Sequence, residues 1–175
     1  MRSIFWILLL FSVLVPSSHA FGIQEEASGD DAAAVLLARL EGTDAAGKGK
    51  VLDDVLADGS NQILAVLSLV VDRTDSTGTP KEWQQQLNSD VTARQVISGL
   101  VMLAAAPGNE KNSAVLAGLL TQRLSEKSKE GIERFLTRML GDLGNPIAVE
   151  ALSASVRADE DWSDETVRSL GSIPG

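Results

Sequence analysis

The chain is predicted to be an all-α protein built from short antiparallel helical hairpins. Two amphipathic segments carry this prediction, because their apolar residues recur at spacings of three and four with polar residues on the opposite face. Sustained alternation typical of a half-buried strand is absent, and only 66–71 could form a short buried strand. The two apolar stripes are Ala93, Val96, Ile97, Leu100, Val101 and Ala104, and Ile132, Phe135, Leu136, Met139, Leu140 and Leu143.

Glycines and prolines divide this helical sequence into short pieces. Thr79-Pro80-Lys81-Glu82 has the form of a capping box, and Pro146 after Asn145 predicts a second helix start. Four glycines, at 42, 59, 108 and 144, are expected at helix C-termini with positive φ. The expected helices span 31–41, 47–58, 61–73, 80–88, 90–106, 110–127, 129–143, 146–158 and 164–172.

Residues 1–20 have the pattern of a secretory signal peptide. Arg2 supplies a positive charge, an apolar run follows to Val15, and small residues end at Ala20. We expect cleavage after Ala20, a flexible leader over 21–30 and a helical repeat domain over 31–175, in a periplasmic or secreted protein. An uncleaved N-terminal anchor is the alternative. No later segment contains the roughly 20 apolar residues of a membrane span.

Composition excludes several kinds of chemistry. The chain has no cysteine, and its one histidine, His19, leaves with the predicted signal peptide. Ser-His-Asp catalysis, Cys-His catalysis and the common zinc sites therefore lack their residues, and no metal or cofactor is expected. The net charge of −9 becomes one unit more negative when Arg2 is removed. Such a surface repels phosphate, so nucleic acid and anionic lipid are not expected partners.

The C-terminal sequence contains a repeat. Leu140-Gly141 returns as Leu170-Gly171 thirty residues later, and 143–152, followed by Asp159 to Trp162 and Val167-Arg168, resembles the HEAT-like helical repeats of the phycobilisome-lyase type. The resemblance is specific over roughly the last 35 residues. It implies hairpins stacked as an α-solenoid, with the second helix of each repeat on the concave side. The final helix is shorter than the family pattern.

Two other motifs have more ordinary interpretations. The segment 42–49 follows the phosphate-binding loop pattern except at Gly49, where the magnesium-binding hydroxyl is missing, so a turn without nucleotide binding is expected. The acidic run 159–165 would need glycine at Asp164 and glutamate at Leu170 to form a calcium loop. We therefore interpret it as an acidic turn with Ser163 as the N-cap.

The favoured function is binding or scaffolding of another protein by an exported helical repeat module. Two alternatives stay open: a carboxylate-dependent enzyme or enzyme-assembly factor, and a helical bundle that binds an apolar small molecule. Whether the protein is an enzyme is not settled, and no catalytic residue is assigned. The candidate binding residues are arginines on outward helix faces and tryptophans near turns, namely Arg94, Arg134, Arg138, Arg168, Trp83 and Trp162.

Overall fold

The computed structural model describes residues 29–74, 78–126, 129–156 and 163–174. These residues form eight α-helices and no strand, which confirms the all-α prediction. The helices are α1 (Gly29–Glu41), α2 (Ala45–Asp58), α3 (Ser60–Ser68), α4 (Pro80–Ala104), α5 (Glu110–Ser125), α6 (Glu130–Leu143), α7 (Ala148–Ser155) and α8 (Ser163–Ser172).

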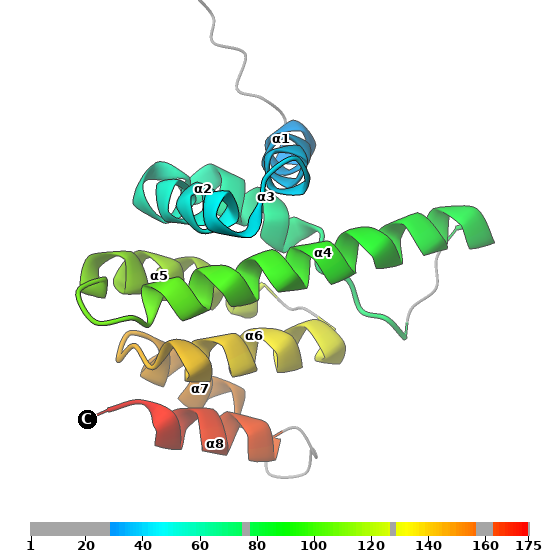
Figure 1. Cartoon of the computed structure of the whole chain (residues 1–175). Coiled ribbons are helices and arrows are strands. Elements are labelled where there is room, and N and C mark those ends of the chain that lie inside the picture. Colours follow the sequence, from blue (N-terminus) through cyan, green and yellow to red (C-terminus); the bar gives the residue numbers. More distant parts are fainter. Residues whose placement is uncertain (1–28, 75–77, 127–128, 157–162, 175) are drawn as a thin grey trace, which may run out of the picture.

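The helices pack in two layers. In one layer α1, α3, α5 and α7 contact each other in succession, and in the other α2, α4, α6 and α8 do so. Figure 1 shows α4, α6 and α8 lying one below the next, with α5 and α7 behind them. Within this layer α6 and α8 run in the same direction, because Arg138 of α6 pairs with Glu165 of α8 and Gly141 accepts a bond from Ser172.

The predicted apolar stripes form the centre of the core. All six stripe residues of α4 are buried, and so are all of those of α6 except Phe135, which is half-buried. Large side chains from the other layer complete the core, and they include Leu36, Ile63, Leu116, Leu120 and Leu152. Burial of apolar surface between the two layers therefore holds the helices together.

The predicted break at residue 89 and the predicted end of the third helix at residue 73 are both wrong. α4 is a single helix of 25 residues, without a break at Ser89. α3 ends at Ser68 instead of continuing to residue 73. Both main-chain polar groups of Val71 bond to side chains of α4, the amide to Asp90 and the carbonyl to Arg94. These tertiary bonds replace the helical bonds that would extend α3.

The helix ends follow the sequence signals only in part. The capping box is confirmed, since Thr79 Oγ1 accepts from the Glu82 amide and Glu82 Oε2 accepts from the Thr79 amide. Gly144 is the C-cap of α6 with positive φ, as predicted. Gly108 also has positive φ, but it lies in the turn after α4, whose C-cap is Ala105. Gly59 has φ −100°, and a Cβ there would lie 2.7 Å from the Val55 carbonyl oxygen, so close packing explains this glycine. Gly42 is also outside the left-handed region.

Residues 42–49, which follow the phosphate-binding loop pattern except at Gly49, are mostly helical. Asp44 caps α2 by accepting a 2.8 Å bond from the Gly47 amide, and Lys48 and Gly49 lie in the first turns of that helix. The predicted turn is therefore confined to residues 42–44. The run 66–71 is the end of α3 and the segment after it, not a strand. α7 begins at Ala148 rather than at Pro146.

Candidate interaction surface

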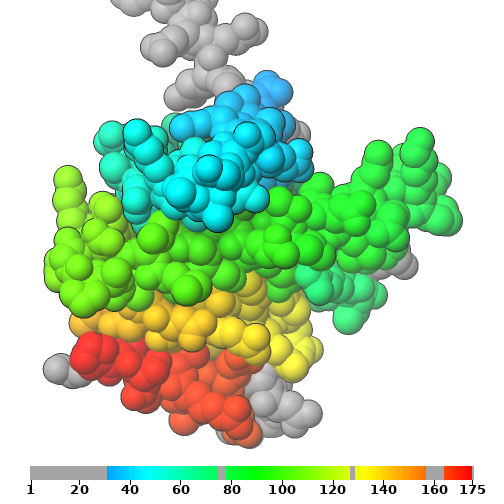
Figure 2. All heavy atoms as spheres, in the orientation of Figure 1, coloured from blue at the N-terminus to red at the C-terminus, as the bar shows by residue number. Residues whose placement is uncertain are grey.

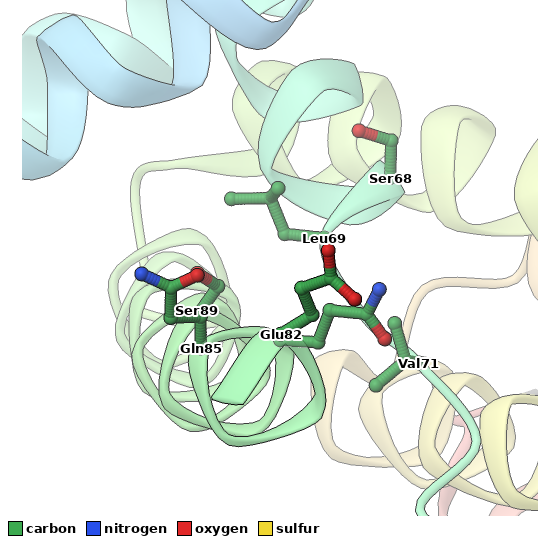
Figure 3. Close-up of a pocket in the computed structure, with 7 residues that line it drawn as sticks. Ser68, Leu69, Val71, Glu82, Gln85 and Ser89 are labelled. Carbon is green, nitrogen blue, oxygen red and sulfur yellow. The ribbon is translucent and has the colours of Figure 1, made fainter. Parts of the chain in front are cut away.

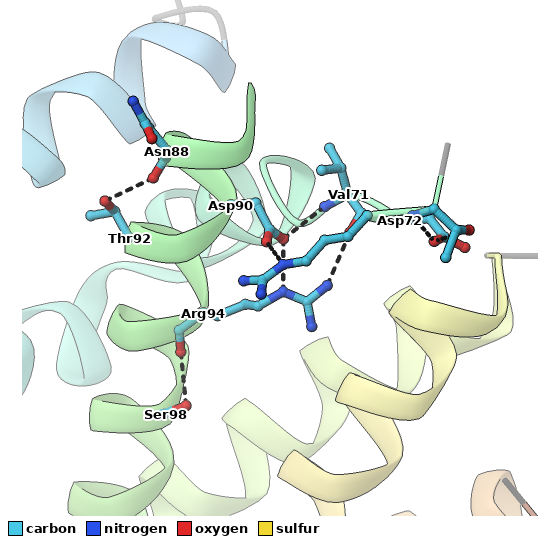
Figure 4. A network of polar contacts seen from close by, with 9 residues as sticks. Val71, Asp72, Asn88, Asp90, Thr92, Arg94 and Ser98 are labelled. Atoms are coloured by element: carbon cyan, nitrogen blue, oxygen red, sulfur yellow. Dashed lines mark hydrogen bonds and ion pairs between the residues drawn. The ribbon is translucent and has the colours of Figure 1, made fainter. Parts of the chain in front are cut away.

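A buried carboxylate joins α4 to the segment 69–74. Asp90 is 0% exposed, and its Oδ1 accepts from Arg94 Nε at 2.7 Å and from the Val71 amide at 3.1 Å. Its Oδ2 accepts from Arg73 Nε at 2.7 Å. Figure 4 shows these groups converging between α4 and the chain after α3. A buried charge is tolerated only when its oxygens are paired in this way.

Arg94 is part of this network, so its assignment as an outward binding residue is wrong. Only 19% of its side chain is exposed. Besides Asp90 it donates from Nη2 to the Val71 carbonyl at 2.9 Å, and its guanidinium carbon lies 4.6 Å from the centre of the Phe135 ring. Arg94 therefore fixes α4 to the 69–74 segment and to α6.

A second acid fixes the same segment to α6. Asp72 is nearly buried and accepts from the Thr74 amide at 2.9 Å, from the Thr74 hydroxyl at 2.7 Å and from the Gly131 amide at 3.4 Å. The Thr74 bonds, helped by the Gly131 amide and by the charge of Lys129, lower the pKa of Asp72 against the opposing effect of burial. Asp72 thus supplies a carboxylate at the positive N-terminal end of α6.

Three of the predicted arginines do lie on the surface. Arg134 and Arg138 are four residues apart and share one face of α6, opposite the buried Leu136 and Leu140. Arg134 pairs with Glu130 at 2.6 Å, and Arg138 pairs with Glu165 of α8 at 2.7 Å.

The Arg138 side chain is 62% exposed despite its ion pair. Its pKa is raised first by the hydrogen bond to Glu165 and then by the charge of that carboxylate. Arg168 is exposed on α8, one turn beyond Glu165. The structure therefore brings Arg134, Arg138 and Arg168 to one side of the molecule.

Exposed apolar side chains of α4 accompany these arginines. The Met102 side chain is 77% exposed and Val91 is also exposed, on the side of α4 opposite Val96 and Leu100. Val96 and Leu100 face the layer of α1, α3, α5 and α7, so Val91 and Met102 point away from that layer. The α6 arginines point away from it as well. We call this surface the even-helix face; it comprises Val91, Gln95, Met102, Arg134, Arg138 and Arg168. The apolar α4 residues were missed because a lone exposed methionine has no sequence pattern.

Trp83 is half-buried near the start of α4 and is not part of the even-helix face. Trp162 and most of the acidic run 159–165 lie outside the described residues. The predicted binding role of both tryptophans therefore stays a prediction.

The described part of the chain contains neither a cluster of metal-ligating side chains nor a membrane-spanning helix. Among those residues no group of three or more acids and histidines is placed to hold a metal ion. None of the described helices is long and apolar enough to cross a membrane.

Comparison with protein-family models, curated protein sequences and solved structures found no match.

Proposed function

We propose that the protein is a binding or scaffolding module that engages another protein through its even-helix face. In this proposal the two helix layers form a short HEAT-like α-solenoid, with each hairpin as one repeat. The succession of contacts within each layer and the common direction of α6 and α8 support that arrangement. Figure 2 views the molecule from the side of α4, α6 and α8.

The proposal depends on one observation: Met102 is exposed on α4, which packs beside α6, the helix that carries the exposed Arg134 and Arg138. Methionine and arginine are enriched at the centres of protein interfaces, and the flexible thioether adapts to irregular partners. The ion pairs of Arg134 and Arg138 lie at the surface. Such pairs contribute about 0 to 1 kcal/mol, so exchanging Glu130 or Glu165 for a partner carboxylate costs little. The preferred partner is therefore a protein with an acidic surface.

The proposed compartment is outside the cytoplasm, because residues 1–20 have the signal-peptide pattern. The intact mass of the protein recovered from the envelope or the medium tests this. A mature chain that begins at Phe21 is expected. A soluble species that retains Met1 to Ala20 would contradict export with cleavage.

Site-specific photo-crosslinking tests the binding surface. A benzophenone amino acid placed at Met102 or at Gln95 is expected to give a covalent adduct with one protein in the native compartment. The matched controls are Val115 of α5 and Val149 of α7, which are exposed on the other layer. Adducts from the α5 and α7 positions with none from α4 would place the interface elsewhere.

Charge reversal then tests the arginines. The double variant Arg134→Glu, Arg138→Glu should reduce capture of the crosslinked partner by about 5-fold to 100-fold, because it replaces attraction by repulsion at an exposed surface. Its unfolding midpoint should stay close to that of the unaltered protein, since the ion pairs of both arginines lie at the surface and contribute little. Unchanged capture would remove the arginines from the interface.

A further inference from the structure

A groove lies between the end of α3 and the first half of α4 (Figure 3). Its volume is about 580 Å³. One wall is formed by Ser68, Leu69 and Val71, and the other by Glu82, Gln85, Gln86 and Ser89. The groove is separate from the even-helix face and uses none of its residues.

The α4 wall is one face of a projecting helix. Glu82, Gln85, Gln86 and Ser89 follow the spacing i, i+3, i+4 and i+7, so they align along one side of α4. Figure 2 shows this first half of α4 extending past the neighbouring helices. Most of its side chains are exposed, so its packing adds little to the stability of the fold. Its exposed side chains form one wall of the groove instead.

The opposite wall is held in place by the buried network. Val71 cannot move away from α4 without breaking the bonds of its amide to Asp90 and of its carbonyl to Arg94. A surface that is already ordered loses little conformational entropy when a ligand binds. The Asp90 network therefore provides a preorganised groove, and this gives the buried charge a role beyond stability.

The groove is negatively charged. Glu82 is the only ionisable residue among the seven that line it. Two bonds from Thr79, one from its amide and one from its hydroxyl, lower the pKa of Glu82, so its carboxylate stays ionised. The C-terminal end of α3 at Ser68 adds partial negative charge. In Figure 3 the Glu82 carboxylate extends from α4 toward Leu69.

We propose that this groove binds an extended segment of a partner protein in which a lysine or arginine stands beside an aliphatic residue. The cation pairs with Glu82, and the aliphatic side chain packs against Leu69 and Val71. The amides of Gln85 and Gln86 both donate and accept, as the main chain of an extended peptide requires. This site goes beyond the proposed function, because its partner carries the opposite charge to the one expected at the even-helix face.

Fluorescence anisotropy of a labelled peptide tests the groove. The probe is a blocked nonapeptide of serine and alanine with a central Leu-Arg-Leu, and a second probe has glutamate in place of the arginine. Gln86→Lys should weaken binding of the first probe by about tenfold or more, because it adds a positive charge that repels the arginine. Glu82→Gln should weaken it by about fivefold, because it removes the negative charge that attracts the arginine. The glutamate probe should not bind.

Two control variants separate the groove from general effects. Gln84→Lys makes the same charge change on the other side of α4, where Gln84 bonds to Asn88, and should change affinity less than twofold. Thr79→Ala removes the capping bond to the Glu82 amide and the hydroxyl bond to the Glu82 carboxylate but keeps that carboxylate and the bond from the residue 79 amide, so it should weaken binding less than Glu82→Gln. Circular dichroism checks that each variant is folded.

Three results would overturn the proposal. The first is absence of binding to the unaltered protein at about 1 mM peptide. The second is an equal loss of affinity in Gln84→Lys and Gln86→Lys. The third is self-association, measured by sedimentation, that Gln86→Lys abolishes, since the occupant would then be a second copy of this chain.

Discussion

Removal of the Asp90 carboxylate should be the most damaging single change near the candidate surfaces. Asp90→Ala leaves three donors without their acceptor: Arg94 Nε, Arg73 Nε and the Val71 amide. The Arg73 side chain is 52% exposed and regains water, so its loss is below about 1 kcal/mol. Arg94 and the Val71 amide are largely covered, and each lost bond costs about 1.5 to 3 kcal/mol.

The expected sum is a decrease of about 3 to 7 kcal/mol in the free energy of unfolding, and its lower half overlaps the usual cost of about 3 to 5 kcal/mol for breaking a buried ion pair. Asp90→Asn keeps the shape and one acceptor, so about 2 kcal/mol is expected. Arg73→Ala should cost less than about 1 kcal/mol. Urea unfolding followed by circular dichroism gives each value from the midpoint and slope. A loss below about 1 kcal/mol for Asp90→Ala would refute the inference that this carboxylate fixes the 69–74 segment.

Three further changes test other parts of the fold. The pKa of Asp72 is lowered from 3.8, so its charge stabilises the fold above about pH 4, and this contribution disappears as the pH falls through the folded-state pKa. Asp72→Asn should therefore make the free energy of unfolding, measured with urea, fall less steeply at acid pH. An unchanged dependence on pH would contradict the assigned bonds. Leu136→Ala should cost about 2 to 5 kcal/mol, since Leu136 is fully buried, and a loss below about 0.5 kcal/mol would mean that the α6 register is wrong. Gly141→Ala should cost about 1 to 3 kcal/mol in thermal unfolding, because the new Cβ would lie 2.6 Å from the Ser169 Cβ, and an unchanged melting temperature would show that α8 shifts freely.

Local patterns predicted the elements whose stability is local or periodic. The α4 and α6 stripes were visible because helix burial repeats every three to four residues, and the Thr79 capping box was visible because its bonds span three residues. The end of α3 was not predictable in the same way. It is set by bonds from Val71 to residues 19 and 23 positions later in the chain, which leave no local pattern.

The role of Arg94 was missed for a related reason. A polar side chain between apolar ones was taken as outward-facing, although its partner Asp90 lies three residues before Ala93 and seven before Ile97, on the buried stripe itself. An acid on an apolar stripe, with an arginine four residues later, is the signal that could have identified the network. Arg134 and Arg138 were placed correctly because they fall opposite the strongest stripe of the chain.

Oxidation of Met102 tests the proposed binding surface most directly. Met102 is 77% exposed whereas Met139 is 5% exposed, so dilute hydrogen peroxide should oxidise Met102 first in the purified protein, as mass spectrometry of peptides would show. In the native compartment a bound partner should slow Met102 oxidation severalfold, and the Arg134→Glu, Arg138→Glu variant should restore the fast rate. Equal rates of Met102 oxidation in the purified protein and in the native compartment would contradict binding at the even-helix face.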